Sequence, residues 1–270
     1  MKLDIYQVDA FASKPFAGNP AAVVPLDEWL ADDVMQQIAA ENNLAETAFF
    51  VKNDGRYDIR WFTPTVEVNL CGHATLASGH VIFNELKTED GHVRFHSHRS
   101  GELAVEKQGD RLVLDFPAYP VQEIEPLPEL ALALGMVPLK TWETQGNMVM
   151  ALLQHEKDVR SLSPDMARLA RLPYDEVIVT SKGDDCDFAS RMFAPRIGIP
   201  EDPVTGAIHC SLIPYWAGEL GRNELFARQV SKRGGELFCE FAGERVKIGG
   251  NAVTFLKGGI FLETSLSKNA

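Results

Sequence analysis

The chain has few cysteines, little positive charge and no long apolar run, and each shortage excludes a class of protein. No apolar stretch approaches the ~18 residues that a membrane-spanning helix needs, and the first residues lack the apolar core of a signal peptide. Only 26 Lys and Arg residues stand against 38 Asp and Glu, a formal net charge of −12. Such a charge disfavours nucleic acid and anionic membranes as partners. We therefore expect a cytoplasmic protein with no nucleic-acid partner and no membrane partner.

The sequence also lacks the common signatures of nucleotide, metal and hydrolase chemistry. It contains no Walker loop, no Gly-x-Gly-x-x-Gly, no His-Glu-x-x-His and no Gly-x-Ser-x-Gly motif. Four widely spaced cysteines are present: Cys71, Cys186, Cys210 and Cys239. Without a Cys-x-x-Cys pair they fit neither a zinc knuckle nor a disulfide scaffold, so we expect reduced thiols. His96 and His98 lie on one face of a predicted strand, but no third ligand is evident, and we expect no metal.

An internal repeat about half a chain long is the main positive feature. The segment RWFTP at residues 60–64 is similar to RMFAP at 191–195. A small-residue loop follows each segment, CGHAT at 71–75 or PVTGA at 203–207, and a Gly-Asn pair precedes each copy. Similar segments in the same order indicate duplication of a half-chain unit.

The seam between the halves is expected in the proline-rich stretch between Pro117 and Pro128, because proline interrupts both helices and strand ladders. We therefore predict two domains, an N-terminal half over residues 1–118 and a C-terminal half over residues 119–270. The last strand of the chain could still pack on the N-terminal half.

Periodicity and capping residues predict the secondary structure of each half. The strands expected in the first half are residues 3–9, 47–51, 57–62 and 112–116. Surface helices are expected at 27–42 and 163–172, the second of them capped by Ser163. Two further helices, 74–86 and 207–220, are apolar almost all round and should be buried, although Pro214 should kink or shorten the second. Each half is therefore predicted to wrap strands around one buried helix.

The two buried helices begin at loops that contain Gly72 and Gly206. A helix N-terminus offers free N–H groups and about half a positive charge, and glycine lets a ligand approach the backbone. If both helix starts face one cleft between the halves, they form a binding site for a small carboxylate. The alternative is a pair of ordinary helix starts in a duplicated structural protein.

Seven motifs along the chain resemble the PhzF-like (phenazine biosynthesis-like) family. They are QVDAF at 7–11, FAGNP at 16–20, NLAETAF at 43–49, RWFTP at 60–64, CGHAT at 71–75, DFPA at 115–118 and EDPVTG at 201–206. The resemblance implies an α+β fold of the diaminopimelate epimerase type, with two pseudo-symmetric halves, each a β-barrel or sheet wrapped around a central buried helix. It also implies a cofactor-free site between the halves and a homodimer.

The family resemblance implies that a glutamate, and not a pair of thiols, transfers the proton. Racemases and epimerases of the same superfamily use one thiol from each half, placed at the helix-opening loops. Here Cys71 holds the first position, but the repeat places Pro203 at the second, and Cys210 lies seven residues later. In the PhzF-like branch a glutamate carries the proton, and the matching residue is Glu46. Its apolar sequence neighbours are expected to raise its pKa from ~4.3 toward ~6 to 7, which suits acid and base catalysis.

The resemblance also assigns catalytic roles to Asp202 and His73 beside Glu46. The residues expected to contact the substrate lie in the surrounding loops: Gly18, Asn19, Cys71, Gly72, Ala74, Val204, Thr205 and Gly206. Each assignment has a plainer alternative, since Asp202 could cap a helix, His73 could be a core histidine, and a Gly-Asn pair often forms a turn.

Two residues depart from the family pattern at the second loop. Ala207 stands where family members often have serine, and Ile208 follows where a small residue is usual. The pocket therefore lacks one hydroxyl donor and is expected to be narrower and drier on that side. A substrate that needs this hydrogen bond should be rejected, because an unpaired buried polar group costs ~1 to 3 kcal/mol.

These features predict a cofactor-independent isomerase of a small carboxylate-containing metabolite, in which Glu46 moves a proton between carbon atoms. Two alternatives remain open at this point. In one, the protein is an amino-acid epimerase or racemase that uses Cys71 with a carboxylate partner. In the other, it binds small carboxylates without catalysis.

Overall fold

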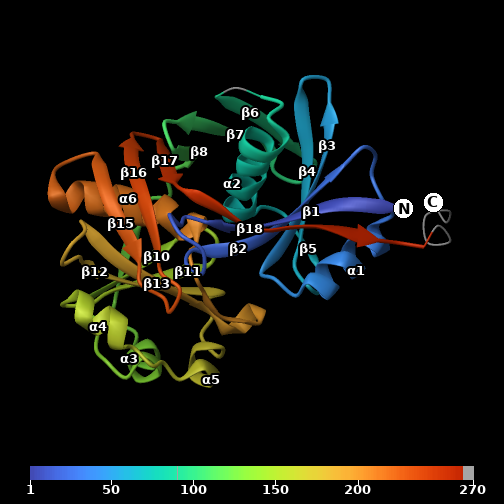
Figure 1. The fold of residues 1–270 in the computed structure, drawn as a ribbon. Helices are drawn as coiled ribbons and strands as arrows, with labels where there is room; N and C mark the ends of the chain where they lie inside the picture. The colour runs from blue at the N-terminus through green and yellow to red at the C-terminus, as the bar shows by residue number, and fades with distance from the viewer. Residues whose placement is uncertain (90, 264–270) are drawn as a thin grey trace. The chain divides into compact units, whose positions relative to one another are not determined.

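The structure is a computed structural model that describes residues 1–89 and 91–263, and it divides into two compact units (Figure 1). Unit 1 contains Met1–Asp115 together with the segment from Gly249 onward, and unit 2 is Phe116–Ile248. The first boundary falls at residue 115 and not at 118. The last described segment, from residue 249 to 263, belongs with unit 1, so the simple division at residue 118 does not describe the molecule.

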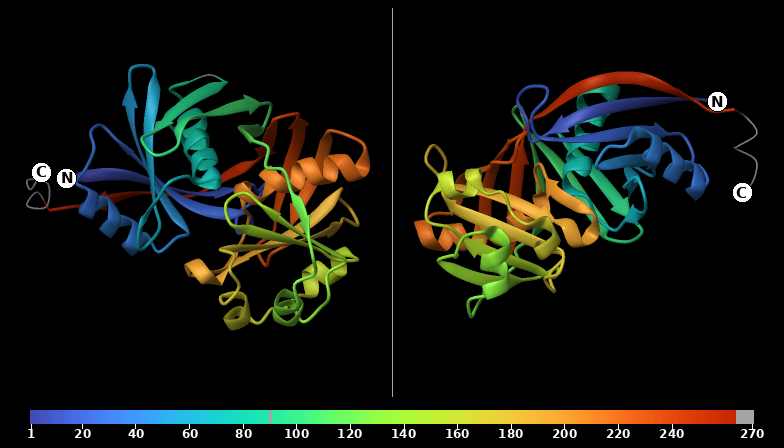
Figure 2. Two further views of the ribbon diagram at one scale, coloured as in Figure 1. Left: turned by 180° about the vertical axis from the view of Figure 1, so that it is seen from behind. Right: turned by 90° about the horizontal axis from the view of Figure 1, so that it is seen from below.

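Strand pairing explains why the end of the chain returns to unit 1. Strand β18 (Ala252–Phe261) runs antiparallel to β1 (Lys2–Ala10), from Lys2 opposite Phe261 to Ala10 opposite Ala252. The two strands lie side by side in blue and red in Figure 2. The open alternative, in which the last strand packs on the N-terminal half, is therefore the arrangement seen.

Strands predominate in both units. Unit 1 also contains β2 (Asn19–Leu26), α1 (Asp32–Asn42), β3 (Glu46–Asn53), β4 (Arg56–Phe62), β5 (Glu67–Val68), α2 (Gly72–His80), the π-helical turn η1 (Val81–Leu86), β6 (His92–Ser97), β7 (Gly101–Gln108) and most of β8 (Arg111–Pro117). Strand β8 and the later strand β17 each cross a boundary between the units. Unit 2 contains β9 (Gln122–Ile124), α3 (Pro128–Leu134), β10 (Lys140–Thr144), β11 (Met148–Leu152), α4 (Glu156–Ser161), α5 (Met166–Leu169), β12 (Glu176–Lys182), β13 (Phe188–Ala194), the 3₁₀ turn η2 (Pro195–Ile197), β14 (Ile199–Asp202), α6 (Gly206–Leu220), β15 (Glu224–Gln229), β16 (Gly235–Ala242) and β17 (Arg245–Gly250). Every strand predicted in the first half is present, extended by one or two residues at one or both ends.

The repeated sequence segments occupy equivalent strands. In unit 1, β2 pairs in parallel with β3, which pairs antiparallel with β4, and β11, β12 and β13 repeat this pattern in unit 2. In β4, the guanidinium of Arg60 donates two hydrogen bonds to Glu67, at 2.8 and 3.0 Å. In β13, Arg191 donates two to Glu201, at 2.7 and 3.0 Å. Such bidentate pairs fix the position of a strand relative to its neighbour.

Helix α2 is buried, as the lack of a polar face in its sequence predicts. All residues from His73 to Gly79 are buried, including the polar Thr75 and Ser78. These two hydroxyls donate to backbone carbonyls one turn earlier, at 2.6 and 2.8 Å, so neither is left without a partner. At Gly79, a Cβ would lie 2.8 Å from the Val105 side chain, so glycine permits the close packing of α2 on β7.

Helix α6 continues to Leu220 through Pro214, so the expected shortening at this proline is wrong. A proline inside a helix leaves the carbonyl four residues earlier, here that of Cys210, without its usual donor. The backbone N–H of Tyr119 donates to this carbonyl at 2.8 Å. The cost of the proline is thereby reduced, because the orphaned acceptor is satisfied from outside the helix.

The two surface helices are shorter than predicted. Helix α1 begins at Asp32 and not at residue 27, with Ala31 at its N-cap. Residues 163–172 form only the four-residue α5, in which the Asp165 side chain accepts from Arg168 N at 3.0 Å. Asp165 therefore caps this helix in place of Ser163, since capping oxygens compete for the same free N–H groups. The periodicity of apolar residues continues beyond the residues that are helical.

Gly18 is required by the close approach of the backbone between β1 and β2. Its φ is +67°, and a Cβ there would lie 2.1 Å from the Ala10 carbonyl oxygen and 2.9 Å from the Ala12 Cβ. We expect Gly18→Ala to lower the free energy of unfolding by about 3 kcal/mol or more, from left-handed backbone strain and a backbone clash. Urea denaturation measures the change.

Gly55 provides the matched control, because its φ is +74° and no atom lies within 4 Å of the position that a Cβ would take there. Gly55→Ala should lose only the ~1 to 2 kcal/mol of backbone strain. Equal losses in the two variants would contradict the assignment of a steric role to Gly18.

Candidate active site

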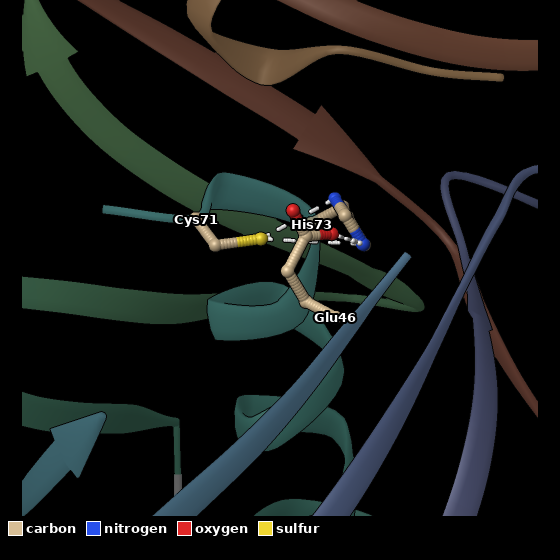
Figure 3. Close-up of side chains that lie close together, drawn as sticks. All are labelled: Glu46, Cys71 and His73. Carbon is tan, nitrogen blue, oxygen red and sulfur yellow. Dashed lines mark hydrogen bonds and ion pairs between the residues drawn. The ribbon is translucent and has the colours of Figure 1, made fainter. Parts of the chain in front are cut away.

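Four side chains of unit 1 meet at the start of α2. Asn19 and Glu46 are the first residues of the parallel neighbours β2 and β3, and Cys71 and His73 belong to the helix start. His73 Nε2 lies 3.2 Å from Glu46 Oε2, and His73 Nδ1 lies 3.2 Å from Asn19 Nδ2. Cys71 Sγ lies 3.5 Å from His73 Nδ1 and 4.0 Å from Nε2. Figure 3 shows the Glu46, Cys71 and His73 side chains converging from β3 and α2.

The carboxyl group of Glu46 is held in its ionised form. Burial raises the pKa of Glu46, but the charge of His73 and hydrogen bonds from His73 and Cys71 outweigh burial and leave the pKa below its ordinary value. The expected rise toward 6 to 7 is therefore wrong in direction. The sequence neighbours of Glu46 are apolar, whereas its spatial neighbours are an imidazole and a thiol.

His73 is correspondingly held in its protonated form. Burial lowers the pKa of His73, but the charge of Cys71 when its thiol is ionised, the charge of Glu46 and the hydrogen bonds to both raise it well above its ordinary value. Cys71 is a neutral thiol at neutral pH, so Glu46 supplies the negative charge there. A doubly protonated imidazole donates from both nitrogens, which requires the Asn19 amide to present its oxygen to Nδ1.

The opposite shifts of Glu46 and His73 set the pH window in which their pairing stabilises the protein. The contribution of Glu46 is complete above its unfolded value of about 4.5 and is lost as pH falls through the lower folded value. The contribution of His73 is complete below about 6.5 and is lost as pH rises through the higher folded value. Both contributions are therefore complete between about pH 4.5 and 6.5.

Cys71 is poorly suited to act as a base. It is buried at the N-cap of α2, and burial together with the charge of Glu46 raises its pKa to about 11, although His73 and the Ala74 amide act in the opposite direction. A thiol must ionise before it can take a proton from carbon. In unit 2, Pro203 occupies the position equivalent to Cys71 in the repeat, and Cys210 lies inside α6 with its pKa raised to about 12 by burial.

The start of α2 adds backbone N–H groups that have no partner within the helix, of which that of Ala74 contacts the Cys71 thiol. The first helical hydrogen bond runs from Thr75 N to Cys71 O at 3.1 Å, so the N–H groups of Gly72, His73 and Ala74 precede the regular helical pattern. Together with the helix dipole, they favour a negative group at this point. The unit 1 residues expected at the site thus lie together, with Gly18 directly before Asn19.

The expected residues of unit 2 form a second polar group at the start of α6. Thr205, at the N-cap, donates its hydroxyl proton to Asp202 Oδ2, and both residues are buried. The Gln229 side chain donates to Asp202 O at 2.8 Å and accepts from Thr205 N at 2.8 Å. Val204 is buried beside them, and Gly206 is the first residue of the helix. Asp202 therefore accepts from a neighbouring hydroxyl in the network that precedes the helix.

Gln229 is a residue that sequence reasoning missed. It comes from β15, is fully buried, and bridges the loop between Asp202 and Thr205. Nothing in the local sequence around Gln229 marks it, because its role depends on a strand that follows α6. Its three hydrogen bonds make the loop rigid.

Glu46, Cys71 and His73 also offer three metal-ligand atoms within 4.8 Å of one another, the one such group among residues 1–89 and 91–263. Zinc would require a thiolate and an unprotonated ring nitrogen. The raised pKa values of Cys71 and His73 oppose both requirements, so the protonation states of the group suit proton transfer better than metal binding. His96, in contrast, is partly exposed and contacts Glu102 at 2.7 Å.

The structure is an α+β protein with a buried glutamate–histidine pair at the start of a helix. Residues 8–258 match the model of the family described as phenazine biosynthesis-like protein. The chain belongs to this PhzF-like family. It is 53% identical to a protein of Pseudomonas aeruginosa named as an uncharacterized isomerase, over 262 residues that cover 97% of this chain and all of the relative.

Solved structures agree with this assignment. A PhzF-family protein from Enterococcus faecalis has a TM-score of 0.94 and 47% identity, covering 97% of this chain and all of that one. A hydroxyproline epimerase from Agrobacterium vitis has a TM-score of 0.61 at 10% identity, covering 98% of this chain and 94% of that one, which shows the fold alone. These matches confirm the α+β, epimerase-like fold class. Within the described residues, no helix is long and apolar enough to span a membrane.

Proposed function

We propose that the protein is a cofactor-independent isomerase that moves a proton between carbon atoms of a small carboxylate-containing metabolite, with Glu46 as the proton carrier. One observation carries the proposal. The Glu46 carboxylate lies 3.2 Å from an imidazole whose proton it stabilises, at a helix start that favours negative charge. Relatives of the chain are named isomerases, in agreement with the class of reaction.

The proposed reaction has two proton transfers and no redox step. The Glu46 carboxylate takes a proton from a carbon that is acidified by an adjacent carboxylate or conjugated system, and the electron pair of the C–H bond moves into that system. Protonated Glu46 then returns the proton to another carbon of the same system. The N–H groups of Gly72 to Ala74 and the His73 imidazolium stabilise the intermediate charge. Proton and electrons balance without another reactant.

The remaining expected residues enter this proposal as binding groups. In unit 1, Gly18, Asn19 and Cys71 border the acid–base pair. In unit 2, Asp202, held by Thr205 and Gln229, orients the substrate. We further propose that the enzyme acts as a homodimer, as the family resemblance implies, and that it is cytoplasmic.

Cys71 is not the base in this proposal, and its removal tests the alternative. Cys71→Ala leaves the Glu46–His73 contact in place, so it should keep at least about a tenth of the activity, measured as kcat/KM. A Cys/carboxylate epimerase would instead lose about 10³-fold or more. Cys71→Ser is the matched control, since it restores a polar atom of similar size. Loss of turnover in both variants would favour the epimerase alternative.

Substrate discovery by isotope incorporation tests the proposed function. The protein is incubated in heavy water with a small-molecule extract and with a panel of small amino and aromatic carboxylates, and mass spectrometry detects a gain of one deuterium or a new isomer. We expect such a product with the wild type and not with Glu46→Gln. The wild type and Glu46→Gln could instead give identical results with every carboxylate in the panel, including carboxylates that are shown to bind. That outcome would favour a protein that binds small carboxylates without catalysis.

A further inference from the structure

The two units place a glutamate at the same point of the same strand arrangement. Strand β3 begins at Glu46 and β12 begins at Glu176. The residue after Glu46 pairs with Phe62, and the residue after Glu176 pairs with Phe193, the equivalent phenylalanine of the repeat. Both strands also have a parallel neighbour, β2 or β11. Glu176 is therefore the counterpart of Glu46 in unit 2.

The surroundings of the two glutamates differ in charge. The Oε2 atoms of both glutamates are buried and lack a hydrogen bond of good geometry within residues 1–89 and 91–263. Glu46 Oε2 lies 3.2 Å from the His73 ring as an ion pair, whereas the charged neighbours of Glu176 are carboxylates. Burial, with the charges of Asp202 and Asp175, raises the pKa of Glu176 to about 7. Asp175 itself contacts Arg196 at 3.2 Å. Glu176 is therefore a neutral acid under conditions in which Glu46 is an anion.

Strand register places Glu176 and Asp202 on one face of the sheet. Ile178 pairs with Met192, and Met192 pairs with Asp202. Directly paired residues of antiparallel strands share a face, and residues two apart on one strand also share it. Glu176 lies two residues before Ile178, so its side chain projects on the same face as that of Asp202. This face adjoins the loop that begins α6.

We propose that Glu176, in its neutral form, is a ligand-binding residue that donates a hydrogen bond to a carbonyl or carboxylate oxygen of the small acid. The inference rests on the function proposed above, from which it takes the class of ligand, a small carboxylic acid. The Glu176 side chain is partly exposed, although its Oε2 atom is buried and lacks a hydrogen-bond partner, so the protein leaves a hydrogen bond of this carboxyl group unmade that a ligand at the exposed part of the side chain can supply. Ionisation removes the donor and adds a charge that repels an anionic ligand.

Carbon-13 NMR of protein labelled at the glutamate carboxyl carbons tests the protonation state directly. The Glu176 resonance is identified by its absence in Glu176→Gln. We expect its midpoint near pH 7, and a midpoint within half a unit of 4.5 would overturn the proposal. Thermal unfolding confirms that the variant is folded.

Binding of two probes, fumarate and benzoate, tests the role in ligand recognition. At pH 6 we expect at least one probe to shift the Glu176 resonance, and its affinity should fall about fivefold to tenfold between pH 6 and pH 8 as the donor ionises. In Glu176→Gln, which keeps an N–H donor, this fall should disappear. Failure of both probes to shift the resonance at pH 6, or an unchanged pH dependence in the variant, would overturn the proposal.

Glu224→Gln is the matched control, since Glu224 is exposed at the start of another strand of unit 2. It should leave probe binding and its pH dependence unchanged. The two proposals fail separately. Loss of isotope exchange in Glu46→Gln with no effect of Glu176→Gln would keep the isomerase and remove the role of Glu176. Normal pH-dependent probe binding without any isotope exchange would keep the role of Glu176 and remove the isomerase.

Discussion

Replacing Glu46 by glutamine is expected to lower kcat/KM by about 10³-fold or more, because an amide cannot accept a proton from carbon. The change keeps the shape of the side chain. It removes the negative charge beside His73, so the imidazole should lose its proton more readily. Ligand binding should persist within a few fold, since the helix start is untouched. Steady-state kinetics and a separate binding titration measure the two effects.

Glu41→Gln provides the control for this substitution. Glu41 is an exposed residue of α1, a few positions before Glu46, and its loss should leave kcat/KM within about twofold. If Glu46→Gln kept more than a tenth of the wild-type rate while folded, another group would have to carry the proton.

Replacing His73 by glutamine is expected to have the second largest effect, a loss of about 10²-fold in kcat/KM at pH 7. Two of the contributions that lower the pKa of Glu46 come from His73. Without them, burial dominates and the pKa of Glu46 rises, so less of the base is ionised. The acidic limb of the pH–rate profile should therefore move to higher pH, and part of the activity should return in alkaline buffer.

The pH profile separates this electrostatic role from a structural one. A variant damaged only in folding would lose activity by a similar factor at every pH. His73→Asn is a second test, since the shorter amide withdraws from Glu46 but keeps a polar group near Asn19. An acidic limb at the same pH in the wild type and both variants would contradict the pairing of Glu46 with His73.

The sequence predicts much of the unit architecture because strands and buried helices depend on local periodicity. Helices α2 and α6 begin within two residues of their predicted starts, since their apolar composition marks burial. The limits of α1 and α5 were missed, because capping is decided by single residues such as Asp165 that compete with their neighbours. The return of β18 to β1 depends on pairing across almost the whole chain, which periodicity does not encode.

The candidate site shows the same division between local and long-range information. The sequence places Glu46, Cys71 and His73 near predicted element starts, but not in contact with each other. The direction of the Glu46 pKa shift follows from that contact, so sequence neighbours alone predict it wrongly. The internal repeat identifies Glu176 from the sequence as the counterpart of Glu46. The number of residues between these two glutamates falls between the separation of the two Gly-Asn pairs and the separation of the two Arg-x-Phe segments.

Deuterium incorporation in heavy water tests the central claim, that Glu46 moves a proton to and from substrate carbon, most directly. Wild type, Glu46→Gln and Cys71→Ala are compared side by side at pH 7 on one substrate identified in the panel. The account predicts a deuterated product or a new isomer from the wild type and from Cys71→Ala, and neither above background from folded Glu46→Gln. Formation of either product by Glu46→Gln at the wild-type rate, or its loss in Cys71→Ala alone, would contradict the account.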